Sequence, residues 1–171
     1  MTNTASKLGV GPNALVGVVR TSSGLHVISH SGFLPGDRIL VVEGERTACP
    51  SRYSVQIDEH THVEVPGGLD PDSELTLARH PWRALNHACE PNARLAGLDL
   101  IAVRPIAPGD EITFDYTSTE YDMSSPFTCR CGRCGGKVIR GFRHLSLTER
   151  QALLPYLSEH LRRRLHADLP G

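Results

Sequence analysis

The chain has 171 residues, of which 39% are hydrophobic and 22% are charged, values typical of a globular protein with one domain. Its 18 Lys and Arg residues are balanced by 19 Asp and Glu residues, so the net charge is −1. This balance argues against general nucleic-acid binding or binding to acidic membranes. The sequence has no run of apolar residues long enough to cross a bilayer, and its polar start is unlike a signal peptide. We therefore expect a cytoplasmic protein, with the oligomeric state left open.

The 16 glycines and 12 prolines favour many short strands over a helical bundle. Residues 1–13 are expected to form a flexible leader. Strands are expected, in chain order, at residues 14–20, 24–29, 38–43, 52–58, 98–103 and 111–114, with further candidates at 61–65 and 74–78. Turn signals separate these runs, which predicts a mainly β protein without βαβ units.

A clear helical pattern occurs only near the C-terminus. Ser146 and Glu149 form a capping-box pattern, and leucines then recur mostly at helical spacing. Pro155 should kink this helix or end its first segment. We expect a C-terminal helix and tail over residues 146–171. The basic run at 162–164 is interpreted as a solvated helix face, with a docking patch as the alternative.

Three of the five cysteines, Cys129, Cys131 and Cys134, lie within six positions. Gaps of one and two residues allow a tight turn around a metal, and a structural zinc takes four ligands. The fourth candidate is Cys89, Cys49 or a histidine. The alternatives are reduced cysteines in a loop or a redox pair at Cys131 and Cys134.

Two further segments read RALNHACEPN at residues 83–92 and PGDEITFDY at residues 108–116. Taken singly, Asn86, His87 and Tyr116 are typical of structural hydrogen-bonding residues. Together the segments resemble the SET-domain methyltransferases, whose patterns are N-H-S-C-x-P-N and G-E-E-[LI]-T-x-D-Y, followed by a cysteine-rich post-SET segment. The resemblance covers roughly residues 12–145.

The resemblance implies a SET fold of small curved β-sheets over residues 14–126, with the two motifs meeting in a pseudoknot-like site. It implies a post-SET segment over residues 127–145 that binds a structural Zn²⁺. The implied zinc ligands are Cys89, Cys129, Cys131 and Cys134. Cys49 is then spare and is expected to be a small apolar residue.

The resemblance also implies an S-adenosyl-L-methionine-dependent N-methyltransferase whose catalytic residue is Tyr116. Phe114 and Tyr53 are expected along the channel for the substrate amine. Phenylalanine at position 114 leaves space, which implies a di- or trimethylated product. The implied cofactor-binding residues are Gly24, Leu25, His26, Arg83, Asn86, His87, Tyr116 and Phe127.

The chain departs from the family pattern at His26, where the family has the second glycine of a G-x-G motif that holds the methionine end of the cofactor. A histidine there crowds the cofactor, moves it or adds a polar contact. The C-x-C-x-x-C spacing is also two residues shorter than the family's frequent form. We expect a protein or peptide substrate with an accessible lysine. The alternatives are a small-molecule amine substrate and a non-catalytic module that binds cofactor or peptide.

Overall fold

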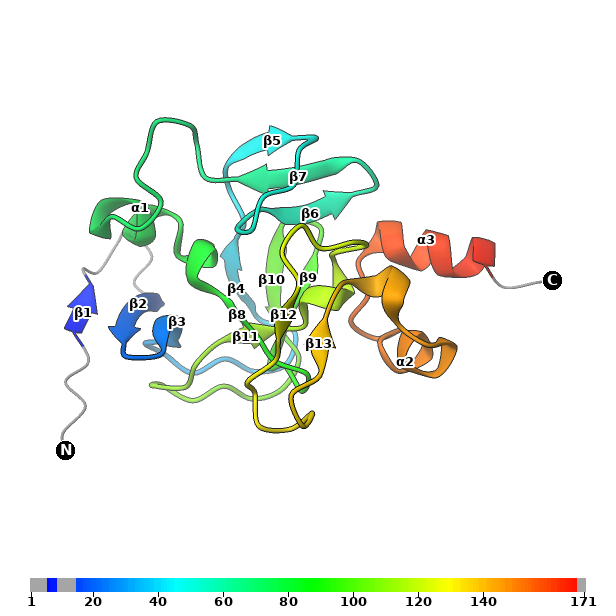
Figure 1. Cartoon of the computed structure of the whole chain (residues 1–171). Coiled ribbons are helices and arrows are strands. Elements are labelled where there is room, and N and C mark those ends of the chain that lie inside the picture. The colour runs from blue at the N-terminus through cyan, green and yellow to red at the C-terminus, as the bar shows by residue number, and fades with distance from the viewer. Residues whose placement is uncertain (1–5, 9–14, 169–171) are drawn as a thin grey trace.

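The computed structural model describes residues 6–8 and 15–168 of the chain (Figure 1). Most of the expected leader therefore lies outside the described residues. Its described part, Ser6–Leu8, forms strand β1, which pairs with β2 (Val16–Thr21). Among the described residues, no helix is long and apolar enough to span a membrane.

The first sheet has the strand order β1-β2-β3 and is antiparallel, with β3 at Gly24–Ser29 as expected. The turn between β2 and β3 closes where Thr21 pairs with Gly24, whose φ of 130° favours glycine. Val18 and Val27 pair across the two strands and are both buried. This buried pair fixes the strand that carries the residues expected at the cofactor site.

Two more three-stranded sheets complete the main core, and both are antiparallel. One has the order β4-β10-β9, with β4 at Arg38–Val41, β9 at Ala93–Ala96 and β10 at Asp99–Ala102. The other has the order β5-β7-β6, with β5 at Glu45–Thr47, β6 at Val55–Asp58 and β7 at Thr61–Glu64. Their buried aliphatic side chains form one hydrophobic cluster with those of the first sheet. The expected mainly β architecture is confirmed.

The strand candidate at residues 74–78 is wrong, because the structure has helix α1 at Glu74–Arg79. The Ser73 side chain caps this helix by accepting a hydrogen bond from the backbone N–H of Thr76. The 3₁₀-helix η1 (Pro81–Ala84) follows and buries Trp82. The Ser73 cap and the burial of Thr76 and Leu77 on one helix face favour a helix over the strand that the short pattern indicated.

The two sequence motifs meet in a parallel pair of short strands, β8 (Asn86–His87) and β11 (Thr113–Phe114). The Asn92 side chain joins them further, since its Nδ2 donates to the Glu111 carbonyl and its Oδ1 accepts from the Thr113 N–H. Both strands lie near the centre of the molecule in Figure 1. This convergence is what the resemblance implied.

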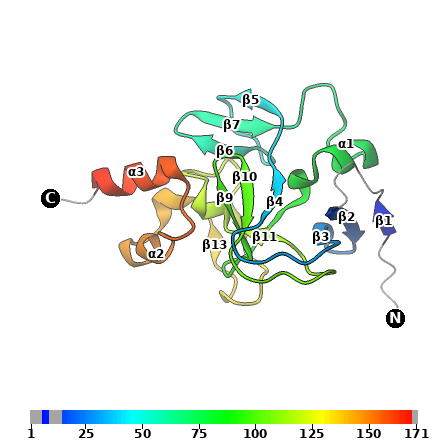
Figure 2. The same cartoon turned by 180° about the vertical axis from the view of Figure 1, so that it is seen from behind.

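The C-terminal part begins with the 3₁₀-helix η2 (Tyr116–Ser118) and a hairpin of β12 (Phe127–Thr128) and β13 (Val138–Ile139). The short η3 (Phe142–His144), α2 (Leu147–Ala152) and α3 (Glu159–Asp168) follow. The capping box at Ser146 is confirmed, and Pro155 separates α2 from α3. Figure 2 shows these helices at the end of the molecule opposite β1.

The basic run at residues 162–164 is not simply a solvated face. Arg163 pairs with Asp58 at 3.0 Å, and Arg164 pairs with Glu59 at 2.5 Å. Asp58 is the last residue of β6, and Glu59 follows it in the turn to β7. The run therefore ties α3 to the β5-β7-β6 sheet.

Candidate active site

Tyr116 is held at the start of η2 by the first motif. Its hydroxyl donates to the carbonyl oxygen of Leu85 at 2.5 Å, and its backbone N–H donates to Nδ1 of His87 at 3.2 Å. Burial raises the pKa of the Tyr116 phenol well above its ordinary value, Glu111 and Glu120 add to the rise, and Arg83 opposes it. The phenol therefore stays protonated, and its oxygen keeps lone pairs free to accept a hydrogen bond.

Aromatic rings enclose the Tyr116 side chain. The ring centres of Phe114, His87 and Phe127 lie 4.9, 5.4 and 5.8 Å from that of Tyr116. The last two contacts are edge-to-face, an arrangement that ring quadrupoles favour. The cage makes the surroundings of the Tyr116 ring largely apolar.

Tyr116 also lines a pocket with about 510 Å³ of empty space, which includes solvent at its opening. Phe114 and Tyr53 line the same pocket, so the structure brings the two expected channel residues to the expected catalytic one. Phe114 is buried, whereas Tyr53 is 41% exposed. Their positions suit a channel that runs from the surface to the Tyr116 hydroxyl.

Arg83 lies on the wall of this pocket. Its guanidinium carbon sits 3.4 Å from the ring centre of Tyr53, and its Nη2 donates to Asp72 at 3.1 Å. The buried Nε of Arg83 has no hydrogen-bond partner among the described residues. We expected Arg83 at the cofactor, and the structure places it beside the channel residue Tyr53.

The residues expected at the methionine end of the cofactor form a polar network. Nδ2 of Asn86 donates to the Leu25 carbonyl at 2.7 Å and to Oε1 of Glu111 at 2.8 Å. Nδ1 of His26 lies 2.8 Å from the same Glu111 oxygen. Glu111 therefore holds the side chains of Asn86 and His26 in place. The sequence motif gave no role to Glu111.

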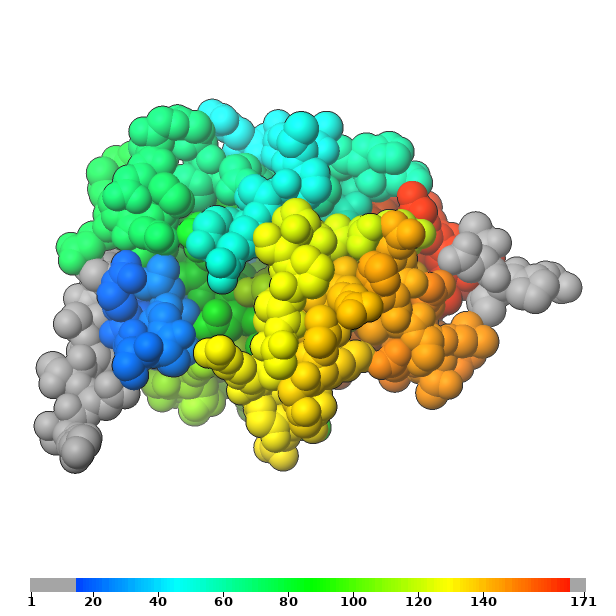
Figure 3. Space-filling view, in the orientation of Figure 1, coloured from blue at the N-terminus to red at the C-terminus, as the bar shows by residue number. Residues whose placement is uncertain are grey.

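Figure 3 shows a hollow in the surface between the blue β2–β3 hairpin and the yellow segment that leads to β12. Gly24, Leu25 and His26 lie on β3, and the half-buried Phe127 lies on β12. The ring of Phe127 is also in edge-to-face contact with that of His87, at 5.7 Å. The expected cofactor-binding residues thus come from both sides of one hollow.

The four expected zinc ligands lie together, with their sulfur atoms all within 4.8 Å of one another. Sγ of Cys89 is 3.8 Å from that of Cys129, and Sγ of Cys131 is 3.9 Å from that of Cys134. Tetrahedral zinc with zinc–sulfur bonds of about 2.3 Å requires sulfur separations of roughly 3.8 Å. The cluster therefore fits zinc, and the open choice of fourth ligand falls on Cys89.

The short cysteine spacing is accommodated by glycine. Gly132, Gly135 and Gly136 have φ angles of 76°, 64° and 83°, which allow tight turns around the cluster. Hydrogen bonds from the backbone N–H groups of Cys89 and Arg133 lower the pKa of Cys131 to about 6, whereas burial raises the pKa of Cys89 and Cys129 above the ordinary thiol value.

The cysteine cluster is connected to Tyr116 through His87. Nδ1 of His87 accepts from the Tyr116 N–H, so Nε2 carries the hydrogen and points to Sγ of Cys89 at 3.3 Å. Burial lowers the pKa of His87, which keeps the ring neutral in this tautomer. Cys49 lies outside the cluster and is exposed, so the expectation of an apolar packing residue is wrong.

A family model described as "SET domain" matches residues 18–117. The chain belongs to the SET domain family. Among curated relatives, "Methyltransferase flvH" of Aspergillus flavus is 38% identical over 85 residues, which are 44% of this chain and 47% of that protein. "Histone-lysine N-methyltransferase ash1" of Drosophila melanogaster is 35% identical over 95 residues, or 47% of this chain and 4% of that protein. The chain therefore spans less than half the length of these relatives.

Among solved structures, "crystal structure of KRYPTONITE in complex with mCHG DNA and SAH" aligns with a TM-score of 0.49 and 22% identity. The alignment covers 67% of this chain and 26% of that one.

Proposed function

We propose that this SET-domain protein is an S-adenosyl-L-methionine-dependent N-methyltransferase that acts on a lysine side chain of a protein or peptide. The observation that carries the proposal is the Tyr116 hydroxyl, fixed on Leu85 and lining the same pocket as Phe114 and Tyr53. Relatives named as histone-lysine N-methyltransferases support the substrate class. Phe114, which lines this pocket without a hydroxyl, supports a di- or trimethylated product.

The residues around the hollow fit S-adenosyl-L-methionine, which when bound supplies a methyl group on a positively charged sulfur. Phe127 and His87 present aromatic rings suited to an adenine. The network of Asn86, Leu25 and Glu111 presents amide, carbonyl and carboxylate groups suited to an amino-acid end. The four-cysteine cluster, whose Cys89 contacts His87, would hold a structural Zn²⁺.

Methyl transfer needs a neutral amine, and a lysine of pKa near 10.4 pays roughly 4 kcal/mol to be neutral at pH 7.4. Phe114 and the Tyr116 ring desolvate the end of the pocket, which lowers the pKa of an amine there. The Tyr116 oxygen can accept an N–H of this amine because its own hydrogen is donated to Leu85. The hydroxyl thereby orients the lone pair of the amine nitrogen toward the methyl group of the cofactor.

The test is an assay with cofactor labelled in its methyl group, zinc-loaded protein and a library of lysine peptides, with a set of free amines in parallel. We expect label on peptides, and a loss of roughly 100-fold or more for Tyr116→Phe, in line with the removal of one transition-state hydrogen bond. Calorimetry with S-adenosylhomocysteine should show that this variant still binds the cofactor product.

The other outcomes separate the alternatives. Label only on free amines would favour a small-molecule methyltransferase. Cofactor binding without any label would favour a non-catalytic module. Equal activity of wild type and Tyr116→Phe would contradict the role of Tyr116.

A further inference from the structure

Glu120 is a buried acidic residue that lines the Tyr116 pocket. The turn that begins at Tyr116 sets this position, because the backbone N–H of Glu120 donates to the Tyr116 carbonyl at 2.8 Å. One helical turn therefore directs both side chains to the same pocket. No sequence motif marked Glu120.

The β6 strand holds the carboxylate in place. The backbone N–H of Gln56 donates to Oε1 of Glu120 at 2.7 Å, and the Gln56 side-chain oxygen accepts from the Tyr121 N–H at 2.8 Å. The Gln56 amide nitrogen is in turn fixed by the carbonyls of Asp58 and Glu59. Glu120 is thus a preorganised group and not a mobile surface acid.

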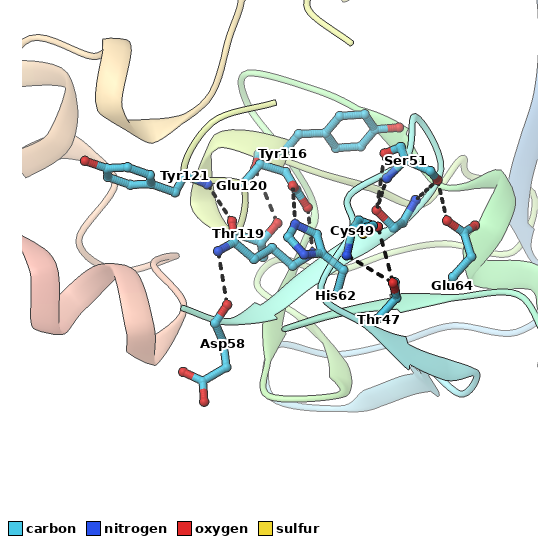
Figure 4. A network of polar contacts seen from close by, with 12 residues as sticks. Thr47, Cys49, Ser51, Asp58, His62, Glu64, Tyr116, Thr119, Glu120 and Tyr121 are labelled. Atoms are coloured by element: carbon cyan, nitrogen blue, oxygen red, sulfur yellow. Dashed lines mark hydrogen bonds and ion pairs between the residues drawn. The ribbon is translucent and has the colours of Figure 1, made fainter. Parts of the chain in front are cut away.

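The second carboxylate oxygen of Glu120, Oε2, has no close partner to balance its negative charge among the described residues. Oε2 lies 3.6 Å from Nε2 of the buried His62, beyond hydrogen-bond distance, and Nδ1 of His62 has no partner among the described residues (Figure 4). Arg83 shares the pocket, but its guanidinium is engaged by Asp72 and the Tyr53 ring. A buried carboxylate without a cation within hydrogen-bond distance is costly, and a cationic ligand would relieve that cost.

We propose that Glu120 is a specificity-determining residue that binds the protonated amine of the substrate as it enters the pocket, before the amine gives its proton to water and reaches Tyr116 as the neutral nucleophile. The site would then select aliphatic ammonium compounds over neutral analogues of the same shape. The inference rests on the proposed function and names the substrate class of the same site. Arg52 and Arg83 on the pocket wall repel a cation that is not directed to Glu120, which makes this carboxylate the decisive contact.

The experiment is an NMR titration of the zinc-loaded protein with N-acetyl-lysine methylamide and with its uncharged analogue N-acetyl-norleucine methylamide. Each titration is run with and without S-adenosylhomocysteine. We expect the lysine compound to bind the wild type at least roughly tenfold more tightly, as one charged hydrogen bond provides. The backbone amide resonance of Gln56 should shift on addition of the lysine compound and not on addition of the norleucine compound. This result can be obtained with the wild-type protein.

Glu120→Gln is the informative variant, because its amide oxygen still accepts the Gln56 N–H while the charge is lost. We expect it to lose the preference for the lysine compound. The matched control is Glu59→Gln, an exposed carboxylate that pairs with Arg164 and lies in the turn after β6, the strand that holds Glu120. This control should keep the preference.

Equal binding of the two compounds to wild type, or an unchanged preference in Glu120→Gln, would overturn the inference. The readout is separate from the proposed function, because amine selectivity is measured even when S-adenosylhomocysteine does not bind. Cofactor binding without amine selectivity would refute only the role of Glu120.

Discussion

His26 and Glu111, 85 positions apart in the sequence, are joined by a 2.8 Å contact between Nδ1 and Oε1. The same carboxylate oxygen accepts a hydrogen bond from Asn86, and Nε2 of His26 lies 3.0 Å from the Thr21 hydroxyl. The imidazole is therefore held on both nitrogens. At the position where the resemblance implies a glycine, the chain has a polar side chain that restrains the residues expected around the cofactor.

The first prediction is that His26→Gly weakens binding of S-adenosylhomocysteine about fivefold. The variant loses a restraint on Glu111 and Asn86 of about 1 kcal/mol, and glycine loosens the β3 strand. Calorimetry on the zinc-loaded protein measures the change. Ser23→Ala is the control and should bind normally, because it removes hydroxyl contacts with Nε2 of His26 and with Thr21 but keeps the contact between His26 and Glu111. Tighter binding by the glycine variant would mean that the imidazole obstructs the cofactor.

The second prediction concerns the metal. The purified chain should bind one Zn²⁺, and Cys89→Ser or chelation should lower the melting temperature by about 10 °C and weaken S-adenosylhomocysteine binding, because the cluster links β8 to the β12–β13 hairpin. Metal analysis and thermal melts provide the measurement. Cys49→Ser should behave like wild type, since Cys49 is exposed and outside the cluster. A full zinc content in Cys89→Ser would exclude Cys89 as a ligand.

The third prediction concerns product multiplicity. Phe114→Tyr should shift the product from di- or trimethyl toward monomethyl, because a hydroxyl beside Tyr116 fills the space that an added methyl group needs. Mass spectrometry of a methylated peptide gives the distribution. Phe127→Tyr, a change of the same kind on the other side of Tyr116, serves as the comparison and should leave the distribution unaltered. An identical product pattern for Phe114→Tyr would refute this role of the position.

The fourth prediction concerns acid stability. Hydrogen bonds from Lys137 and then Ser146 lower the pKa of Glu149 to about 2, from an ordinary 4.5. The stabilisation is therefore complete above pH 4.5 and is lost as the pH falls toward 2. Because Glu149 is partly exposed, we expect about 1 kcal/mol. Glu149→Gln should be less stable than wild type at pH 7 and equal to it at pH 2, as measured by urea unfolding. A difference that persists at pH 2 would contradict this, and Glu159→Gln on α3 is the control.

The elements that were predicted well have local causes. β3 matches its expected range because β-branched residues follow a glycine turn, and α2 begins at its expected capping box. The strand expected at residues 74–78 was missed because a run of five residues with apolar and polar alternation also suits one face of a short capped helix. A pattern of only five residues does not distinguish the two-residue period of a strand from the 3.6-residue period of a helix.

The candidate site also has features that short sequence motifs predicted and features that they did not. The motifs around Asn86 and Tyr116 predicted the convergence of β8 and β11. The cysteine spacing predicted three ligands of the metal cluster, and the resemblance to the family predicted the fourth, Cys89. The position of Arg83 beside Tyr53 and the carboxylate of Glu120 had no sequence signal. Both depend on contacts between segments that are far apart along the chain.

The sequence by itself determined the family, the mainly β character and the residue types that carry the expected chemistry, because these follow from spacing within short segments. Only the tertiary structure decided that His26 pairs with Glu111, that Arg83 lies against the Tyr53 ring and that Glu120 lines the Tyr116 pocket. The physical reason is that a hydrogen bond or an ion pair is set by distances of a few ångströms between groups whose separation in sequence carries no such information.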